Sequence, residues 1–437
     1  MALKNKITSR DARIGVIGLG YVGLPLAMEF TRSGFNVTGI DIDTEKVEKL
    51  SRGENYIQDV KDTDLDHAIQ KNLFSASTDF SVIQDLDAIS ICVPTPLNKE
   101  KNPDISFINS VMDSLKDYIH PDMLIVLEST TYPGTTRELI LPKLAEKGYV
   151  VGEDFYLCFS PERIDPGNTE FGTANTPKVL GGITKKCSEM GSALYETIVS
   201  QVVSVSSPET AEMVKLLENT FRAINIGLAN EVAIMCEKLK VDVWEVIDAA
   251  ATKPFGYMKF TPGPGLGGHC IPIDPHYLSW KLKALDYDAR FIQLAGEINT
   301  AMPRHVANLV RDGLNSQQKS IKGSNILVIG VAYKKNVNDV RESPALDVMK
   351  LLQHDGAAIS FFDPHISQVR LNEETMAGHE FLSRDILNKA DAVIIITDHD
   401  NIDFQLISTE SRLIIDTRNV IDKNCSTVVR LGVGNQG

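Results

Sequence analysis

The sequence lacks the marks of several large classes of protein. No apolar run approaches the roughly 20 residues that a membrane-spanning helix needs, and the apolar stretch after residue 13 is too short and glycine-rich for a signal peptide. The six cysteines lie far apart without a C-x-x-C pair, which favours a reducing cytoplasm over a disulfide framework. The nine histidines lack the spacing of metal ligands, so we expect no metal.

An excess of positive charge is also missing. The 44 Lys and Arg are outnumbered by 58 Asp and Glu, which gives a net charge of −14. This balance argues against nucleic acid as a partner, since such a partner requires a basic face. It permits an anionic small ligand, because a few local cations set the field in a cleft. The length of 437 residues predicts two or three domains at roughly 150 residues each.

Short apolar strands alternate with helical segments at both ends of the chain. Near the N terminus we expect strands at residues 13–18, 36–40, 87–93 and 124–127, with a helix at 22–33. After Gly323, the runs SNILVIG, AAISFFD, ADAVIIIT and RLIID predict four more strands. This alternation is typical of parallel sheets with helices on both faces.

A single long helix is predicted between these two parts, over residues 208–240. Pro208 suits its first turn, and Ser207 is a plausible N-cap. Apolar residues recur at helical spacing: Ala211, Val214, Leu217, Phe221, Ile224 and Leu228. The length favours a connector or the spine of an oligomer.

Gly18, Gly20 and Gly23 form a G-x-G-x-x-G motif between the first strand and the first helix. These glycines permit a tight turn, close approach of a pyrophosphate, and close packing of helix on strand. Asp41 ends the second strand, where its carboxylate suits a ribose diol and repels a 2′-phosphate, so we expect NAD rather than NADP. The alternative is a glycine turn without a ligand, which the order of strand, motif, helix, strand and Asp disfavours.

The segment FTPGPGLGGHCIPID, residues 260–274, is the most unusual in the chain. Its glycines and prolines allow the backbone to wrap closely around a ligand. Cys270 lies at the end of this loop, where a following helix N terminus would lower the pKa of its thiol. We interpret the other five cysteines as small buried hydrophobes, but the setting of Cys270 favours a nucleophile.

NAD combined with a nucleophilic cysteine indicates oxidation of an aldehyde to an acid. The expected sequence is a thiohemiacetal, hydride transfer, a thioester and hydrolysis by water. Lys215 and Asn219 lie four residues apart on one face of the long helix and would stabilise an oxyanion. A solvated helix face remains the alternative for this pair.

Seven segments in order resemble the nucleotide-sugar 6-dehydrogenases of the UDP-glucose/GDP-mannose dehydrogenase family. They are GLGYVGLP, VPTP, ESTTYPG, SPER, KLLENTFRAINIGLANE, PGPGLGGHCIPIDP and YKKNVNDVRESPA. The resemblance implies two Rossmann-like doubly wound domains joined by a long central helix: an NAD-binding domain at 1–206, a helical dimerisation domain with the cysteine loop at 207–318, and a UDP-binding domain at 319–437. It also implies a homodimer or higher homo-oligomer built on the central helix.

The resemblance further implies a role for each matching residue. Cys270 would be the nucleophile, Lys215 and Asn219 would polarise the C6 oxygen, and Asp274 would position water or assist deprotonation. Thr130 and Glu162 would lie beside the reacting carbon, with Glu162 as a base for hydrolysis. NAD would contact Gly18, Gly20, Tyr21, Val22, Gly23, Asp41, Lys46, Thr95, Thr130 and Arg341. The UDP-sugar would contact Glu162, Arg163, Lys215, Asn219, Phe260, Gly263, Gly265, Gly267, Tyr333, Lys334 and Arg418.

Two departures from the family pattern stand out. UDP-glucose dehydrogenases carry a second glutamate four residues after the position of Glu162, where this chain has Pro166, with Asp165 adjacent. The base is therefore less well defined than the nucleophile. In the C-terminal part, Gly330-Val331-Ala332 is only the start of a fingerprint, so this domain need not hold a dinucleotide.

The expected reaction is a four-electron, NAD-dependent oxidation of UDP-N-acetyl-D-glucosamine to its uronic acid, for a surface polysaccharide such as O-antigen. UDP-glucose, UDP-N-acetylgalactosamine and UDP-N-acetylmannosamine remain alternative substrates. A single-step β-hydroxyacid dehydrogenase shares the overall plan but has no use for Cys270. A non-catalytic NAD-binding protein would not need Lys215, Asn219, Cys270 and Asp274 together.

Overall fold

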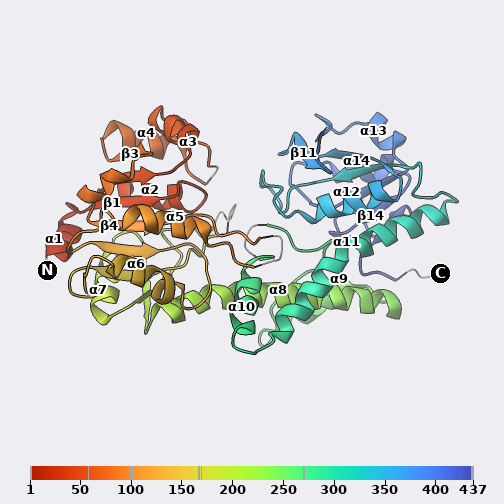
Figure 1. Cartoon of the computed structure of the whole chain (residues 1–437). Coiled ribbons are helices and arrows are strands. Elements are labelled where there is room, and N and C mark those ends of the chain that lie inside the picture. The colour runs from red at the N-terminus through yellow and green to blue at the C-terminus, as the bar shows by residue number, and fades with distance from the viewer. Residues whose placement is uncertain are drawn as a thin grey trace. The chain divides into compact units, whose positions relative to one another are not determined.

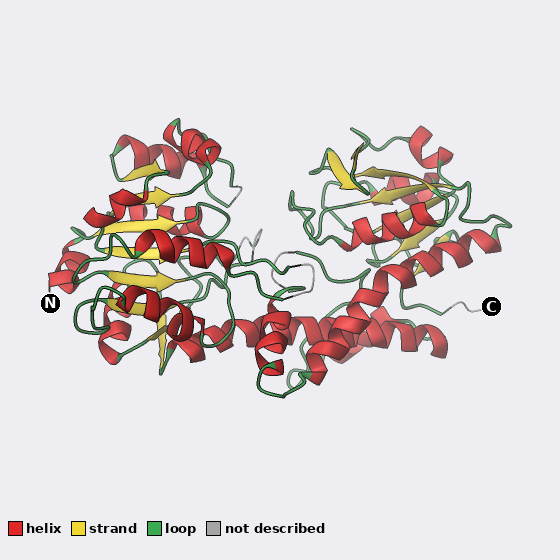
Figure 2. Ribbon diagram, in the orientation of Figure 1, coloured by secondary structure: helices red, strands yellow, loops and turns green. Residues whose placement is uncertain are grey.

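The computed structural model describes residues 2–57, 59–98, 102–165, 168, 170–268 and 271–434 (Figure 1). The chain forms two compact units. The first contains Met1–Glu218 and His276–Tyr287, and the second contains Asn219–Pro275 and Asp288–Gly437. In both units the strands lie between helices (Figure 2).

An eight-stranded sheet forms the centre of the first unit, in the order β3-β2-β1-β4-β5-β6-β7-β8. Its first six strands are parallel and follow the order 3-2-1-4-5-6 of a doubly wound dinucleotide-binding fold. β7 pairs antiparallel with β6, and β8 is parallel to β7. The bounds are β1 Arg13–Ile17, β2 Asn36–Ile40, β3 Phe74–Ser77, β4 Ala88–Ile91, β5 Leu124–Leu127, β6 Tyr156–Phe159, β7 Lys178–Gly182 and β8 Val202–Val205.

Helices cover both faces of this sheet and bury its apolar side chains. One core contains residues of α1 (Ala2–Ser9), α2 (Gly23–Arg32), α3 (Thr44–Ser51), α4 (Asp62–Gln70) and α7 (Lys185–Tyr195). The other contains residues of η1 (Phe80–Asp85), α5 (Ser106–Leu115), η2 (Thr136–Ile140) and α6 (Leu141–Ala145). Every residue of β4, β5 and β6 is buried, as expected for parallel strands covered on both faces.

The second unit holds a five-stranded parallel sheet in the order β10-β9-β13-β14-β15. Residues of α11 (Arg290–Ser316) and α12 (Pro344–His354) pack on one face, and residues of α13 (Arg384–Lys389) and α14 (Phe404–Glu410) on the other. The four predicted strands are confirmed, whereas β15 and the β11–β12 hairpin were not predicted. The bounds are β9 Asn325–Ile329, β10 Ala358–Phe362, β11 Gln368–Leu371, β12 Glu374–Ala377, β13 Ala392–Ile395, β14 Ile414–Asp416 and β15 Val428–Arg430.

The predicted long helix is α8, Pro208–Leu239, with 32 residues. Ser207 Oγ accepts a hydrogen bond from the Thr210 backbone N–H, as the predicted N-cap requires. Two shorter helices follow, α9 (Val243–Ala251) and α10 (Asp274–Lys283). The fold class and the long helix are confirmed, while the domain boundaries at 206 and 318 stay predictions. Across the described part of the chain, every helix is too short or too polar to cross a membrane.

Candidate active site

The three glycines of the motif occupy positions with different steric demands. Gly18 has φ +91°, and a Cβ there would lie 2.6 Å from the Cys92 carbonyl oxygen. A Cβ on Gly23, where α2 begins, would lie 1.8 Å from the Gly18 carbonyl oxygen. A Cβ on Gly20 would meet nothing within 4 Å. The fold therefore requires Gly18 and Gly23, whereas Gly20 leaves open space beside the backbone, as close approach of a pyrophosphate needs.

Asp41 connects the end of β2 to the glycine turn. Its Oδ2 accepts a hydrogen bond from the Leu19 N–H at 2.8 Å, and its Oδ1 accepts one from the Asp43 N–H at 3.0 Å. The third contact is long, 3.5 Å from Oδ2 to the Lys46 ammonium. A carboxylate accepts about four hydrogen bonds, so Asp41 retains capacity for a ribose hydroxyl. The residues predicted for the adenosine half of NAD thus meet at one edge of the sheet.

The second unit repeats this turn after β9 but uses its carboxylate differently. Gly330 has φ +75°, and its Cβ would lie 2.2 Å from the Thr397 carbonyl oxygen. Asp363 follows β10 and accepts hydrogen bonds from the N–H groups of Val331 and Ala332, at 2.7 and 2.9 Å. It also bonds the buried His399 at 3.1 Å and the backbone of His365 at 2.8 Å. These contacts use the capacity of the Asp363 carboxylate.

Lys215 and Asn219 are buried in their helix, with 8% and 6% of their surface exposed. The alternative of a solvated helix face is therefore wrong for this pair. Asn219 Nδ2 donates a hydrogen bond to Asp274 Oδ2, and Asp274 is itself 3% exposed. Cys270 lies outside the described residues. The second unit thus places Asn219 and Asp274 together, and Lys215 belongs to the first unit.

Glu162 lies just past the end of β6 and is held as a charged carboxylate. Its Oε1 accepts hydrogen bonds from the N–H groups of Arg163 and Ile164, at 2.7 and 2.9 Å. Its Oε2 lies 3.4 Å from the Lys178 ammonium. Burial alone would raise the pKa of Glu162, but Lys178, these two N–H donors and the charge of Lys215 hold it below its usual value. Pro166, where the family's second glutamate would stand, lies outside the described residues.

The loop after β5 carries Thr130 and is tied to the start of α8. Glu212 on α8 is fully buried, and it accepts hydrogen bonds from the backbone N–H groups of Gly134 and Thr136 at 2.6 and 2.9 Å. Thr95 follows β4, and its carbonyl oxygen accepts a hydrogen bond from the Tyr277 hydroxyl at 2.9 Å. Glu212 therefore anchors the loop that carries Thr130, and Tyr277 anchors the segment that carries Thr95. Both threonines belong to the first unit.

The glycine loop packs directly on Tyr333 within the second unit. A Cβ on Gly267 would lie 2.8 Å from Tyr333 Cβ, and one on Gly268 would lie 2.7 Å from Tyr333 Cε2. Gly265 has φ +136°, and the Gly263 N–H donates a hydrogen bond to Asn230. The loop can lie this close only because its glycines carry no side chain.

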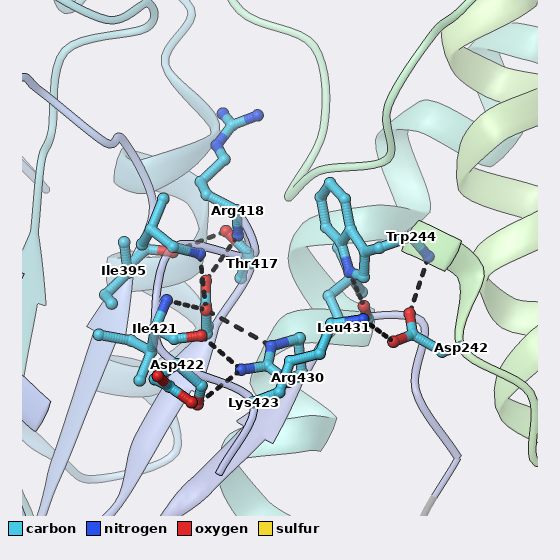
Figure 3. Close-up of polar contacts among 12 residues, drawn as sticks. Asp242, Trp244, Ile395, Thr417, Arg418, Ile421, Asp422, Lys423, Arg430 and Leu431 are labelled. Atoms are coloured by element: carbon cyan, nitrogen blue, oxygen red, sulfur yellow. Dashed lines mark hydrogen bonds and ion pairs between the residues drawn. The ribbon is translucent and has the colours of Figure 1, made fainter. Parts of the chain in front are cut away.

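Arg418 approaches the same loop from the end of β14. A Cβ on Gly263 would lie 2.7 Å from Arg418 Nη1, and Arg418 Nε donates a hydrogen bond to the Ile396 carbonyl at 2.7 Å. Asp416 shapes the turn by accepting hydrogen bonds from the N–H groups of Arg418 and Ile421. The guanidinium of Arg418 points away from Ile421 and Arg430 (Figure 3). Burial lowers the pKa of Arg418, yet an arginine stays charged, so its Nη groups suit a diphosphate.

Other predicted residues have more ordinary surroundings. Arg341 belongs to the second unit, where its guanidinium pairs with Asp339 at 2.7 Å. Phe260 packs its ring 5.9 Å from that of Phe221. Arg163 pairs with Glu218 of α8. Tyr21 and Val22 lie in the glycine turn, and Lys334 follows Tyr333 in the loop after β9.

Sequence reasoning missed a buried ionic cluster beside Glu162. Lys178 begins β7, and its ammonium lies 2.6 Å from Glu128 Oε2 at the end of β5. Tyr195 of α7 donates a hydrogen bond to the other oxygen of Glu128. Burial raises the pKa of Glu128, although Lys178 opposes this. The sequence signal that could have indicated this cluster is a charged residue next to an apolar strand. Glu128 in VLEST and Lys178 in KVLGG are such residues.

Comparison with known proteins identifies the family. Residues 12–199, 209–301 and 327–423 match, in order, the NAD binding domain, the central domain and the UDP binding domain of the UDP-glucose/GDP-mannose dehydrogenase family. The chain belongs to this family. As a UDP-glucose/GDP-mannose dehydrogenase family member, it is an NAD-dependent oxidoreductase that acts on a UDP-sugar.

Named relatives match along almost the whole chain. A UDP-N-acetyl-D-mannosamine dehydrogenase of Methanococcus maripaludis is 34% identical over 94% of this chain and 93% of its own length. An NDP-N-acetyl-D-galactosaminuronic acid dehydrogenase of Ralstonia nicotianae is 34% identical over 93% and 95%. The solved UDP-D-ManNAc dehydrogenase of Pyrococcus horikoshii superposes with a TM-score of 0.88 at 32% identity, covering 97% of this chain and 99% of the other.

The residues present fit NAD as the cofactor of the first unit. The open space at Gly20 and the remaining capacity of Asp41 are the observations that support this fit. Among the described residues, no group of three or more His, Cys, Asp or Glu is arranged to hold a metal ion.

Proposed function

We propose that this protein oxidises the C6 hydroxymethyl group of a UDP-N-acetylhexosamine to a carboxylate in two NAD-dependent steps. UDP-N-acetyl-D-glucosamine is the first candidate, on the resemblance of the segments DAAATKPFGY and GLGGHCIPIDP to that branch of the family. The product would be a uronic acid for a surface polysaccharide. We keep the cytoplasm as the expected compartment, because the five described cysteines are free thiols.

The burial of Lys215 and Asn219 is the observation that carries this proposal. Burying a charged ammonium costs free energy unless the charge interacts with a partner or a ligand. Lys215 is only 8% exposed, although the apolar Leu217 on the same helix is 58% exposed. No hydrogen bond joins Lys215 to another described residue, and its positive charge contributes to lowering the pKa of Glu162. Such a cation suits an alkoxide or oxyanion at C6.

Each polar residue then has a defined task in the reaction. Lys215 and Asn219 hold the C6 oxygen while its proton leaves, and NAD, when bound, accepts a hydride in each oxidation. The Cys270 thiolate adds to the aldehyde to give a thiohemiacetal, which is oxidised to a thioester. Asp274 and Glu162 orient the water that hydrolyses the thioester and receive its proton. Arg418 and the glycine loop bind the UDP part.

A different N-acetylhexosamine is the second candidate substrate. The relatives from Methanococcus maripaludis and Pyrococcus horikoshii are named for N-acetyl-D-mannosamine, at 34% and 32% identity. This favours UDP-N-acetyl-D-mannosamine over UDP-glucose as the alternative. We expect these relatives and this protein to catalyse the same type of reaction. The two candidate sugars differ in configuration at C2, and a panel of UDP-sugars must decide between them.

The deciding experiment combines a substrate panel with cofactor stoichiometry. We expect two NADH for each sugar consumed, and the highest kcat/KM for UDP-N-acetyl-D-glucosamine among the four UDP-sugars. A ratio of one NADH for each sugar would refute the four-electron mechanism. A higher kcat/KM for UDP-N-acetyl-D-mannosamine would replace the first candidate by the second.

A homodimer built on α8 completes the proposal. Large apolar side chains of this helix are exposed: Met213, Leu217, Phe221, Leu228, Met235 and Leu239. Exposure of so much apolar surface on one helix is typical of a protein interface. Light scattering should give twice the mass of one chain, and Leu228→Glu should shift the population toward the monomer. A wild-type protein that stays monomeric at micromolar concentration would contradict this.

A further inference from the structure

The register of β6 and β7 places a lysine opposite the proposed catalytic carboxylate. Cys158 pairs with Gly182 and Phe159 with Gly181, in antiparallel register. The same register, continued three residues beyond Phe159, brings Glu162 opposite Lys178. The observed distance from Lys178 Nζ to Glu162 Oε2 is 3.4 Å. The reversal of one strand in an otherwise parallel region therefore creates this contact.

Lys178 is held in this position by a second carboxylate behind it. Its side chain is 5% exposed, and Glu128, which is fully buried, lies 2.6 Å from its ammonium. Glu128 in turn accepts a hydrogen bond from the Tyr195 hydroxyl, and the Lys178 ammonium lies 5.0 Å from the centre of the Tyr195 ring. Movement of the lysine away from Glu162 would therefore also disturb its contacts with Glu128 and Tyr195.

We propose that Lys178 is a positioning residue for thioester hydrolysis: it fixes the Glu162 carboxylate, in its charged form, toward the reaction, while Glu128 and Tyr195 fix Lys178. The proposal rests on the function proposed above for Glu162. Because the backbone N–H groups of Arg163 and Ile164 occupy Oε1, Oε2 is the oxygen that Lys178 controls.

Other charged groups around Glu162 set the expected direction of the effect. The positive charge of Lys215 on α8 stabilises the charged form of Glu162, whereas the negative charge of Glu128 on the β5 side destabilises it. Glu218 on α8 is paired with Arg163. Without the positive charge of Lys178, only the two backbone N–H donors and Lys215 offset burial, so the pKa of Glu162 rises.

The test replaces each member of the cluster by a neutral residue of similar shape. Lys178→Met removes the positive charge, and Glu128→Gln disturbs the same cluster while keeping that charge. The double variant removes both, so that no unpaired charge stays buried if the single variant folds poorly. Lys143→Met is the matched control, because it removes a partly buried lysine from its ion pair with Asp113, away from Glu162.

The variants are compared between pH 5 and 8 by kcat and by the NADH formed in the first turnover. For Lys178→Met and the double variant, kcat should fall about tenfold for each pH unit below the new pKa of Glu162. At low pH they should release a burst of two NADH for each active site, because hydrolysis has become the slow step. Lys143→Met should show neither change. Glu128→Gln keeps the charge of Lys178 but holds it less firmly, so kcat should fall by a similar factor across this pH range, without the acid limb.

Two results would overturn the proposal. One is a kcat profile of the double variant that is parallel to that of the wild type, without a burst. The other is the same acid limb in Glu128→Gln, which would show that the integrity of the cluster matters rather than the charge of Lys178. A wild-type protein that forms no NADH would instead refute the proposed function itself.

Discussion

Gly20 and Gly23 belong to one motif, yet alanine should affect them in opposite ways. In Gly23→Ala the new methyl would start 1.8 Å from the Gly18 carbonyl oxygen, so β1 and α2 must separate by more than 1 Å. Overpacking costs about 1–3 kcal/mol, and a clash with backbone lies at the upper end of this range, which corresponds to a fall in Tm of roughly 6–12 °C for a unit of this size. In Gly20→Ala the methyl meets nothing within 4 Å, so stability should change by less than about 0.5 kcal/mol.

The binding of NAD should show the reverse order of sensitivity. The Gly20 methyl would occupy space that the pyrophosphate needs, at a cost of about 1–3 kcal/mol, or roughly a 5- to 150-fold weaker Kd. Thermal unfolding and fluorescence titration with NADH measure the two effects separately. Gly34→Ala is the control, since Gly34 has φ +91° with nothing near its Cβ, and it should lower Tm slightly without weakening NADH. Unchanged NADH binding by Gly20→Ala would refute this reasoning, as would an unchanged Tm for Gly23→Ala.

Three further substitutions test other parts of the site. Cys270→Ser should lower uronic acid formation by roughly 10³-fold or more, because an alkoxide does not form at neutral pH as a thiolate does; turnover at the wild-type rate would remove Cys270 from its role. Asp41→Asn should reduce the preference for NAD over NADP by about tenfold in kcat/KM, since it removes the charge that repels a 2′-phosphate, and an unchanged ratio would contradict this. Arg418→Lys should raise KM for the UDP-sugar by about 10- to 100-fold with little change in Tm, because an ammonium lacks the fork that binds a diphosphate; a fall in kcat alone would place Arg418 elsewhere in the mechanism.

Local patterns were sufficient to predict eight of the strands, the long helix and the glycine turn, but not β3, β6, β7, β8, β15 or the β11–β12 hairpin. Each depends on residues close together in sequence, such as apolar runs that end in glycine. The burial of Lys215 was beyond such reasoning, because α8 exposes Leu217 and Phe221 and buries a lysine, the opposite of what polarity suggests. Which face of a helix is buried depends on partners that a local pattern does not contain.

The cluster at Lys178 was hidden for a related reason. Glu128 and Lys178 lie 50 residues apart, and they meet only because β7 runs antiparallel to β6. A single sequence gives the composition of a strand but not its direction in the sheet. A charged residue at the end of an apolar strand is compatible with exposure to solvent as well as with a buried pair. Pairing between distant strands therefore determines the features that sequence reasoning missed.

The two carboxylates that follow the second strands of the two sheets show how one turn serves two purposes. Asp41 and Asp363 both accept a hydrogen bond from the loop after a glycine with positive φ, so the backbone geometry is the same. His399 distinguishes them, because it adds a fully buried side-chain contact to Asp363, whereas the side chain that approaches Asp41 is the partly exposed Lys46. A saturated carboxylate cannot receive a ribose diol. The same fold can therefore bind a dinucleotide in the first unit, whereas the second must recognise its nucleotide through other groups, such as Arg418, which lies against the glycine loop.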